Sequence, residues 1–210
     1  MHYPSQLISL ESRNQAYRES LENPEEFWAN VANDFTWKRK WDRVLDWNFE
    51  EPNVRWFDGA QLNITENCLD RHLPERGDEI ALIWESNSPN EESKKYTFTE
   101  LHEAVCVFAE VLRKGDMKKG DRVCIYMGMV PELAIAVLAC ARVGAIHSVI
   151  FGGFSAHSVA DRVNDAQASA IITCDGAYRG AKDIQLKSII DEALEHCSSV
   201  KTVWVYERTD

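Results

Sequence analysis

The chain has 210 residues, and its 23 Lys and Arg against 34 Asp and Glu give a formal net charge of -11. Such an acidic balance argues against non-specific binding to nucleic acid or to an anionic membrane surface, because both are polyanions. The N-terminal segment lacks the apolar core of a signal peptide and no uncharged run is long enough to span a bilayer, so we expect a soluble, cytoplasmic protein.

The cysteines and histidines follow no disulfide or metal-binding pattern. No Cys-x-x-Cys pair occurs, and several cysteines lie inside apolar runs, as is typical of buried free thiols in a reducing compartment. The histidines are scattered, so we expect no metal site. The six cysteines are Cys68, Cys106, Cys124, Cys140, Cys174 and Cys197.

Residues 1–75 differ in composition from the rest of the chain. Five of the seven tryptophans precede residue 60, interleaved with acidic and basic residues. Aromatic and basic residues can stack together on nucleic acid, but the acidic neighbours and the net charge oppose this interpretation. We therefore expect a helical and irregular lead-in segment whose aromatic residues pack on the main domain. Within it, Asn23, Pro24 and Glu26 supply start signals for a helix that should run to about Asn33.

From Ile80 onward, strand-like and helix-like segments alternate. Segments 80–85 and 94–98 flank a polar loop and predict a hairpin. Thr97 or Thr99 can cap the helix that follows, which ends at Gly115 after two basic residues. Its apolar positions follow the helical period and comprise Leu101, Ala104, Val105, Phe108, Val111 and Leu112.

Further strand and helix units follow with short connections. A strand at 122–127 leads to a helix from Pro131 to Gly144, which is apolar nearly all round and should be buried. The next units are a strand at 145–151 with a helix capped by Ser155, a strand at 170–174 with a helix over 184–197, and a strand at 200–206. We expect residues 76–210 to form an incomplete α/β domain, a mainly parallel sheet with helices on both faces.

Ligands of such sheets bind beyond the carboxyl ends of the strands. This rule selects the turn Phe151-Gly152-Gly153-Phe154 and the loop Asp175 to Asp183. Because their strands are consecutive in the chain, we expect the two carboxyl ends to lie side by side, with Arg179 and Lys182 near the glycine turn. Two cations and exposed backbone donors would form a cradle for a phosphate or diphosphate group. The alternatives are solvated loop charges, and glycines that only permit close packing of a helix against a strand.

The glycine spacing by itself is a weak signal. A Rossmann-type oxidoreductase domain would need G-x-G-x-x-G or G-x-G-x-x-A, and neither follows Gly152. The Gly-Lys-Ser/Thr ending of nucleotide hydrolases is also absent. This alternative is therefore less favoured than a nucleotide- or coenzyme-A-binding module.

Four longer segments, taken in order, carry a more specific signal. They are WFDGAQLNITENCLDRHL (56–73), YTFTELHEAVCVFA (96–109), KKGDRVCIYMGMVPELAIAVLACARVGAIHSVIFGGFSA (118–156) and DGAYRGAKDI (175–184). They resemble the AMP-forming acetyl-coenzyme A synthetases of the adenylate-forming superfamily, and the resemblance extends from about Pro24 to the last residue. It implies an acetate-CoA ligase, in which acetate and ATP, the latter with Mg²⁺, give acetyl-adenylate. The thiol of coenzyme A (CoA) then displaces AMP.

The resemblance also implies roles for particular residues. Arg179, Gly180, Ala181 and Lys182 match the segment that holds the nucleotide end of CoA. Phe151, Gly152 and Gly153 match the glycine turn along the path of CoA. Many members have arginine where Lys182 stands, and lysine keeps the charge but lacks the bidentate fork.

The family's other functional segments do not occur in this sequence. They are a Ser/Thr/Gly-rich ATP loop ending in Pro-Lys-Gly, an aromatic adenine-binding segment, a hinge aspartate and a C-terminal catalytic lysine. The resemblance therefore implies the N-terminal part of a synthetase, with no catalytic residue of its own and inactive without the C-terminal part of the same polypeptide. The segment HSVIFGGFSA favours acetyl over propionyl relatives. A stand-alone nucleotide- or CoA-binding module stays open as the alternative.

Overall fold

The computed structural model describes residues 7–88, 90–180 and 182–209. It divides into two compact units, Met1–Asn63 and Ile64–Asp210. This division comes earlier than residue 75, where the sequence predicts the end of the lead-in segment. The packing of that segment on the main domain stays a prediction, and each unit is described by itself.

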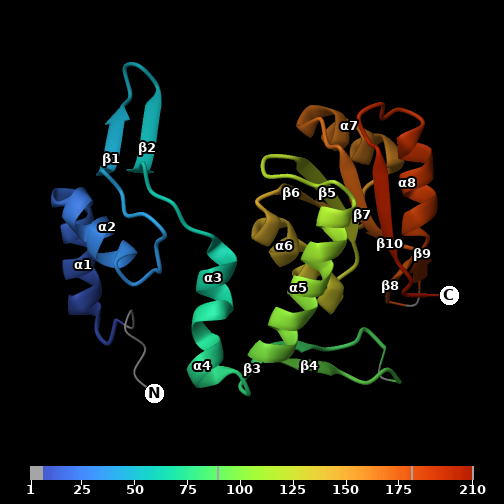
Figure 1. The fold of residues 1–210 in the computed structure, drawn as a ribbon, viewed down its shortest axis with the longest axis horizontal. Helices are drawn as coiled ribbons and strands as arrows, with labels where there is room; N and C mark the ends of the chain where they lie inside the picture. The colour runs from blue at the N-terminus through green and yellow to red at the C-terminus, as the bar shows by residue number, and fades with distance from the viewer. Residues whose placement is uncertain (1–6, 89, 181, 210) are drawn as a thin grey trace. The chain divides into compact units, whose positions relative to one another are not determined.

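From residue 7 onward, where the structure describes it, the first unit contains two helices and a hairpin (Figure 1). Helix α2 (Pro24–Ala32) follows α1 (Leu10–Glu22) and confirms the predicted helix. Proline suits its first position because that N–H has no partner within the helix. Asn23 makes no side-chain cap bond, and its backbone N–H instead donates to the Glu19 carbonyl at the end of α1. The sequence did not predict the antiparallel hairpin of β1 (Arg43–Asn48) and β2 (Asn53–Asp58).

Aromatic rings of the first unit pack against one another. The ring centroids of Trp37 and Trp41 lie 5.6 and 5.2 Å from that of Phe57, and Trp28 meets Trp56 edge-on at 5.9 Å. Among the described residues of this unit, the buried apolar residues are Ala32 and Val44. The first unit therefore has a small core.

The second unit begins with short helical segments and the predicted hairpin. The segments are α3 (Ile64–Cys68), the 3-10 turn η1 (Asp70–His72) and α4 (Leu73–Arg76). Strands β3 (Ile80–Trp84) and β4 (Lys94–Thr97) then pair antiparallel, as predicted. None of the helices in the described part of the chain is long and apolar enough to cross a membrane.

Helix α5 (Phe98–Lys114) shows which threonine provides the cap. The Thr97 hydroxyl accepts from the Glu100 backbone N–H at 3.2 Å, and the Glu100 carboxylate accepts from the Thr97 N–H at 2.8 Å. Thr99 instead donates to the Gly77 carbonyl at 3.0 Å. The buried residues of α5 are Leu101, Val105, Ala109 and Leu112, while Val111, one of the apolar positions that follow the helical period, is 38% exposed.

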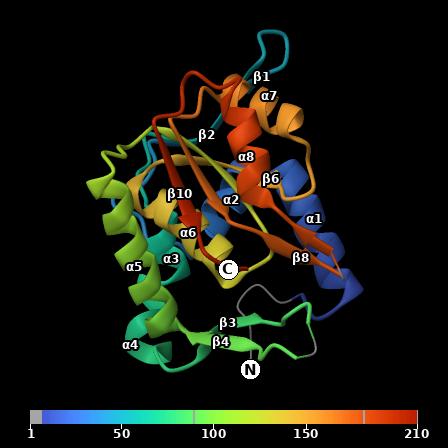
Figure 2. The same cartoon turned by 90° about the vertical axis from the view of Figure 1, so that its right-hand side faces the viewer.

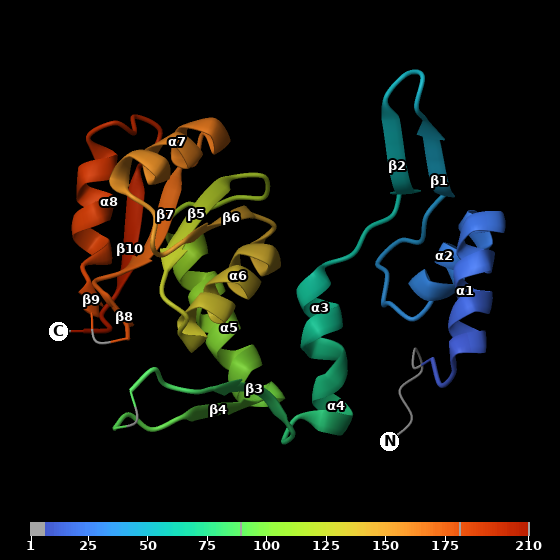
Figure 3. The same ribbon diagram turned by 180° about the vertical axis from the view of Figure 1, so that it is seen from behind.

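A four-stranded parallel sheet forms the centre of the second unit and confirms the predicted fold class. Its order is β10-β7-β5-β6. Helices α5 and α6 cover one face, and α7 and α8 cover the other (Figures 1 and 3). The remaining elements are β5 (Arg122–Met127), α6 (Pro131–Val143), β6 (Ile146–Phe151), α7 (Ala156–Ala166), β7 (Ala170–Cys174), α8 (Leu186–Leu194) and β10 (Thr202–Tyr206).

The strand order corrects one expectation from the sequence. Strand β5 pairs with both β6 and β7, so the carboxyl ends of β6 and β7 do not lie side by side. Strands β5 and β7 are almost wholly buried, whereas β6 is largely exposed. Two strands buried on both faces belong inside a parallel sheet, and β6 lies at its edge. The chain therefore runs from β5 outward to β6 and then back across β5 to β7.

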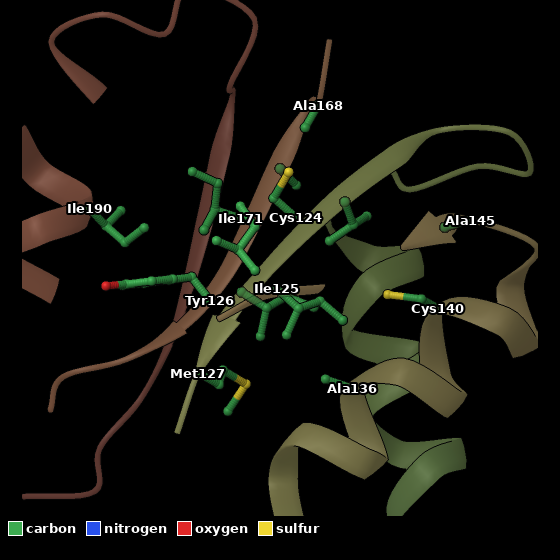
Figure 4. Packing of buried hydrophobic residues seen from close by; sticks show 14 of the residues in the cluster. Cys124, Ile125, Tyr126, Met127, Ala136, Cys140, Ala145, Ala168, Ile171 and Ile190 are labelled. Carbon is green, nitrogen blue, oxygen red and sulfur yellow. The ribbon is translucent and has the colours of Figure 1, made fainter. Parts of the chain in front are cut away.

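The core of the second unit lies on both sides of β5 (Figure 4). Ala136 and Cys140 of α6 lie on one side of the strand, and Ile190 of α8 lies on the other. Burial raises the pKa of the Cys140 thiol to about 12, so this cysteine is an inert apolar residue. The expectation of buried free thiols is confirmed for Cys124, Cys140, Cys174 and Cys197, whereas Cys68 is exposed and Cys106 half-buried.

Candidate functional site

A cleft of about 480 Å³ lies in the second unit, beyond the carboxyl ends of β5 and β6. The chain leaves β5 and β7 toward opposite faces of the sheet, and such a reversal of strand order opens a crevice where ligands bind. The cleft is therefore at the position expected of a ligand site. Its lining comes from residues 84–87, 127–130, 149–153 and 177–180, with Leu133, Ile184 and Arg208.

The glycine turn differs from the predicted anion cradle. The N–H groups of Gly153 and Phe154 both donate to the Phe151 carbonyl, at 2.8 and 3.1 Å. These two donors are used within the turn, which weakens the expectation of exposed backbone donors for a phosphate. The predicted cap is present, since the Ser155 hydroxyl accepts from the Ser158 N–H at the start of α7.

The missing side chains of Gly152 and Gly153 leave room for different neighbouring atoms. A Cβ on Gly152 would lie 3.0 Å from the backbone carbonyl oxygen of Met127. A Cβ on Gly153 would lie 2.7 Å from Cε1 of Phe151 and 3.2 Å from Nη1 of Arg179. Neither glycine has a positive φ. Gly152 thus permits two strand ends to approach closely, while Gly153 leaves room for side chains at the cleft.

The segment predicted as a loop after β7 is a small hairpin. Strands β8 (Ala177–Arg179) and β9 (Lys182–Ile184) pair antiparallel, with Arg179 opposite Lys182. Gly180, which follows β8, has a φ of +61°, in the left-handed region that favours glycine. Strands of three residues are too short to show the alternation that identifies a strand in a sequence. Ala181, a predicted site residue, lies outside the described residues.

The hairpin brings Arg179 to the glycine turn although β6 and β7 are not neighbours. The guanidinium carbon of Arg179 lies 5.8 Å from the centre of the Phe151 ring. Gly180 also lines the cleft, whereas Lys182 is exposed and does not line it. Neither Arg179 nor Lys182 forms an ion pair with another residue in the described part of the chain. The structure therefore gathers Phe151, Gly152, Gly153, Arg179 and Gly180 at one cleft.

Three further cleft residues were missed by the sequence analysis. Arg208 lies between two rings, 5.4 Å from the centre of Trp84 and 5.1 Å from that of Tyr178. Trp84 donates its indole N–H to the Met129 carbonyl at 2.7 Å. These residues come from distant parts of the chain and share no motif, so no sequence signal could have joined them.

Two carboxylates beside the cleft are held in their charged form. Hydrogen bonds from Arg208 and Ser86 lower the pKa of Glu91 below its usual value. Burial alone would raise the pKa of Asp175, but hydrogen bonds from the backbone N–H groups of Thr209, Arg208 and Gly176 lower it to about 2. Both carboxylates are ionised at neutral pH and act as hydrogen-bond acceptors.

The charges and rings at the cleft are suited to binding a ligand. Arg179 offers a positive charge with no ion-pair partner among the described residues, and Phe151 and Tyr178 offer exposed rings. No group of three or more His, Cys, Asp and Glu that could hold a metal ion occurs among the residues described. The cleft can therefore accept an anionic ligand that also has apolar surface.

Comparisons with known proteins identify the family of the chain. The family model described as AMP-binding enzyme matches residues 69–210, and the model described as the acetyl-coenzyme A synthetase N-terminus matches residues 13–68. The acetyl-coenzyme A synthetase of Alkalilimnicola ehrlichii is 47% identical over 203 residues, which are 96% of this chain and 31% of that protein. The corresponding protein of Leptospira biflexa is 50% identical over 204 residues, again 96% of this chain and 31% of the relative.

Among solved structures, the acetoacetyl-CoA synthetase from Streptomyces lividans matches with a TM-score of 0.82 and 30% identity. The match covers 90% of this chain and 29% of that one. The chain thus spans about a third of the length of the curated relatives it matches. Because a single family model covers more than half of its residues, the chain belongs to the family of AMP-binding enzymes.

Proposed function

We propose that this chain is the N-terminal part of an AMP-forming acetate-CoA ligase. Acetate and ATP give acetyl-adenylate and pyrophosphate, and the thiol of CoA then displaces AMP to form acetyl-CoA. The names of the most similar relatives and the match of the acetyl-coenzyme A synthetase N-terminus support this assignment. They also leave the Rossmann-type oxidoreductase alternative without support.

The cleft, in this proposal, contributes to the CoA site. The observation that carries the proposal is Arg179, an exposed guanidinium beside the cleft without a carboxylate partner among the described residues. CoA carries a 3′-phosphate and a diphosphate, and a guanidinium binds phosphate oxygens in a bidentate manner. Lys182, opposite Arg179 on the hairpin, would add a second charge from the outer side. Gly153 leaves the space beside Arg179 free of a side chain.

The remaining chemistry belongs, in the same proposal, to residues beyond this segment. We assign Arg179 and the apolar surface of the cleft to binding, and we assign no acid, base or nucleophile to this segment. ATP, its Mg²⁺ and the acyl pocket would be held by the C-terminal part of the longer polypeptide. The chain by itself should therefore give no acetate-dependent exchange of pyrophosphate into ATP above a buffer control. Measurable pyrophosphate exchange by the chain would refute the assignment of adenylation to the C-terminal part.

The CoA site can be tested in a hybrid enzyme. In it, this chain replaces the matched residues of the A. ehrlichii enzyme. A charge-assisted bond to phosphate contributes roughly 1.5–3 kcal/mol, so Arg179→Ala should raise the KM for CoA about tenfold to a hundredfold. The constants for acetate and ATP should stay unchanged. Arg113→Ala, on the exposed surface of α5, is the matched control. An unchanged KM for CoA would make Arg179 a solvated surface charge and refute the proposed site.

A further inference from the structure

The hairpin that carries Arg179 is too small to hold its own position. Its strands have three residues each, and they form a separate two-stranded sheet. An isolated hairpin of two strands is marginally stable in water. The place of Arg179 therefore depends on contacts between the hairpin and the rest of the second unit.

One such contact joins the hairpin to the loop between β3 and β4. The Asn87 side chain donates to the Gly180 carbonyl at 3.0 Å, at the tip of the hairpin. In Figure 2, β8 runs from the end of the sheet toward the side where β3 and β4 lie. The loop between β3 and β4 thus supports the residue next to Arg179.

A second contact passes through Arg208. Its guanidinium lies 5.1 Å from the ring centre of Tyr178 on β8, and its Nη2 lies 2.6 Å from Oε2 of Glu91 in the β3–β4 loop. Glu91 also accepts from the Ser86 hydroxyl. The side chains of Arg208 and Glu91 are only 17% and 28% exposed, so water screens this ion pair less than a surface pair.

The backbone of Arg208 is itself fixed to the end of β7. The Asp175 carboxylate accepts from the N–H groups of Arg208 and Thr209, at 2.7 and 2.9 Å. Arg208 therefore connects the end of the sheet, the hairpin and the β3–β4 loop. Its charge is neutralised by Glu91, in contrast to the exposed charge of Arg179.

We propose that the Glu91–Arg208 ion pair positions the β8–β9 hairpin, and through it places Arg179 at the cleft. The inference rests on the proposed function, in which Arg179 binds a phosphate of CoA. Glu91 is then a positioning residue that never touches the ligand. Breaking the pair should loosen the hairpin and weaken use of CoA while acetyl-adenylate formation continues.

The positioning role can be measured without any ligand. We expect Glu91→Gln, which keeps the size of the side chain but removes its charge, to speed hydrogen–deuterium exchange in residues 177–184 about tenfold. Exchange in β5 and β7 should not change. Glu92→Gln, at the exposed neighbouring position, is the matched control. Asn87→Ala removes the separate hydrogen bond to the Gly180 carbonyl and should also speed exchange in the hairpin. Unchanged exchange in the hairpin of Glu91→Gln would overturn the proposal, whatever the result for Asn87→Ala.

The hybrid enzyme provides the functional half of the test. Glu91→Gln should raise the KM for CoA about tenfold and leave acetate-dependent pyrophosphate exchange intact. A lower KM for CoA would overturn the proposal, because it would mean that a freed Arg208 binds the ligand directly. If Arg179→Ala leaves the KM for CoA unchanged while Glu91→Gln still loosens the hairpin, the CoA site is refuted and the positioning of the hairpin stands.

Discussion

Adjacent residues at the cleft have different structural surroundings. Gly152 and Gly153 are adjacent and look equivalent in the sequence, yet a Cβ would meet backbone at Gly152 and the ends of side chains at Gly153. A backbone carbonyl at the end of a paired strand moves less readily than an exposed ring or a guanidinium. We therefore expect Gly152 to be needed for packing, whereas the proposed ligand role applies to Gly153.

We expect Gly152→Ala to lower the melting temperature of the chain, because its Cβ would press on the Met127 carbonyl oxygen. Gly153→Ala should change the melting temperature less and, in the hybrid enzyme, reduce thioester formation while pyrophosphate exchange persists. Thermal unfolding and the two half-reactions measured side by side test both statements. Equal loss of both half-reactions and of stability in Gly153→Ala would leave the turn with a packing role only.

Asp175 should contribute to stability in a manner that depends on pH. Its pKa in the folded chain is about 2, below the ordinary value of 3.8, so its contribution is complete above the unfolded pKa and is lost as the pH falls toward 2. The shift corresponds to roughly 2 kcal/mol. Asp175→Asn should therefore lower the free energy of unfolding by about 2 kcal/mol at pH 7 and by less at pH 3. Urea unfolding at both pH values, with exposed Asp165→Asn as control, measures this difference, and a loss independent of pH would contradict it.

Two helix ends were predicted correctly because their signals are local, whereas the helix predicted over 184–197 is α8 (Leu186–Leu194), and Ile184 lies in β9. Ser155 caps α7 and Gly144 ends α6 with a φ of +79°, the left-handed conformation that favours glycine. The hairpins β1–β2 and β8–β9 were not predicted as strands. Their short strands are exposed along much of their length, so they lack the alternating apolar pattern on which a strand prediction depends.

The capping box of α5 should make a measurable contribution to the free energy of unfolding. Thr97→Ala removes the acceptor for the Glu100 N–H and should lower the free energy of unfolding by about 1 kcal/mol. Thr97→Ser keeps the hydroxyl and should cost much less. Urea unfolding of the two variants and the unchanged chain gives the comparison, and equal losses would show that the methyl group of Thr97 matters more than its hydroxyl.

At the scale of the whole molecule, the apolar core is concentrated in the second unit. Its cluster extends from Leu69 to Cys197, while the first unit buries Ala32 and Val44 among its described apolar residues. A chain segment with so little buried apolar surface is marginally stable alone. The two units should therefore differ in their ability to fold independently.

We expect a fragment of residues 64–210 to unfold cooperatively in urea and a fragment of residues 1–63 not to do so. A fragment of residues 76–210 would lack buried Leu69, and Asp70, which pairs with Arg142, and should be less stable than 64–210. Circular dichroism during urea unfolding measures all three. Equal stability of the two longer fragments would favour a boundary near residue 75, as the sequence predicts.

The sequence by itself determined the types of the main elements, the fold class and the two segments that meet at the cleft. Caps, periodicity and glycine positions act between residues close together in the chain, so they can be read without a structure. Only the tertiary structure decided that β5 separates β6 from β7, that Gly153 and Phe154 use their N–H groups within the turn, and which side chains meet Arg208. These outcomes depend on contacts between distant segments, and the burial that selects a strand order is a property of the whole sheet.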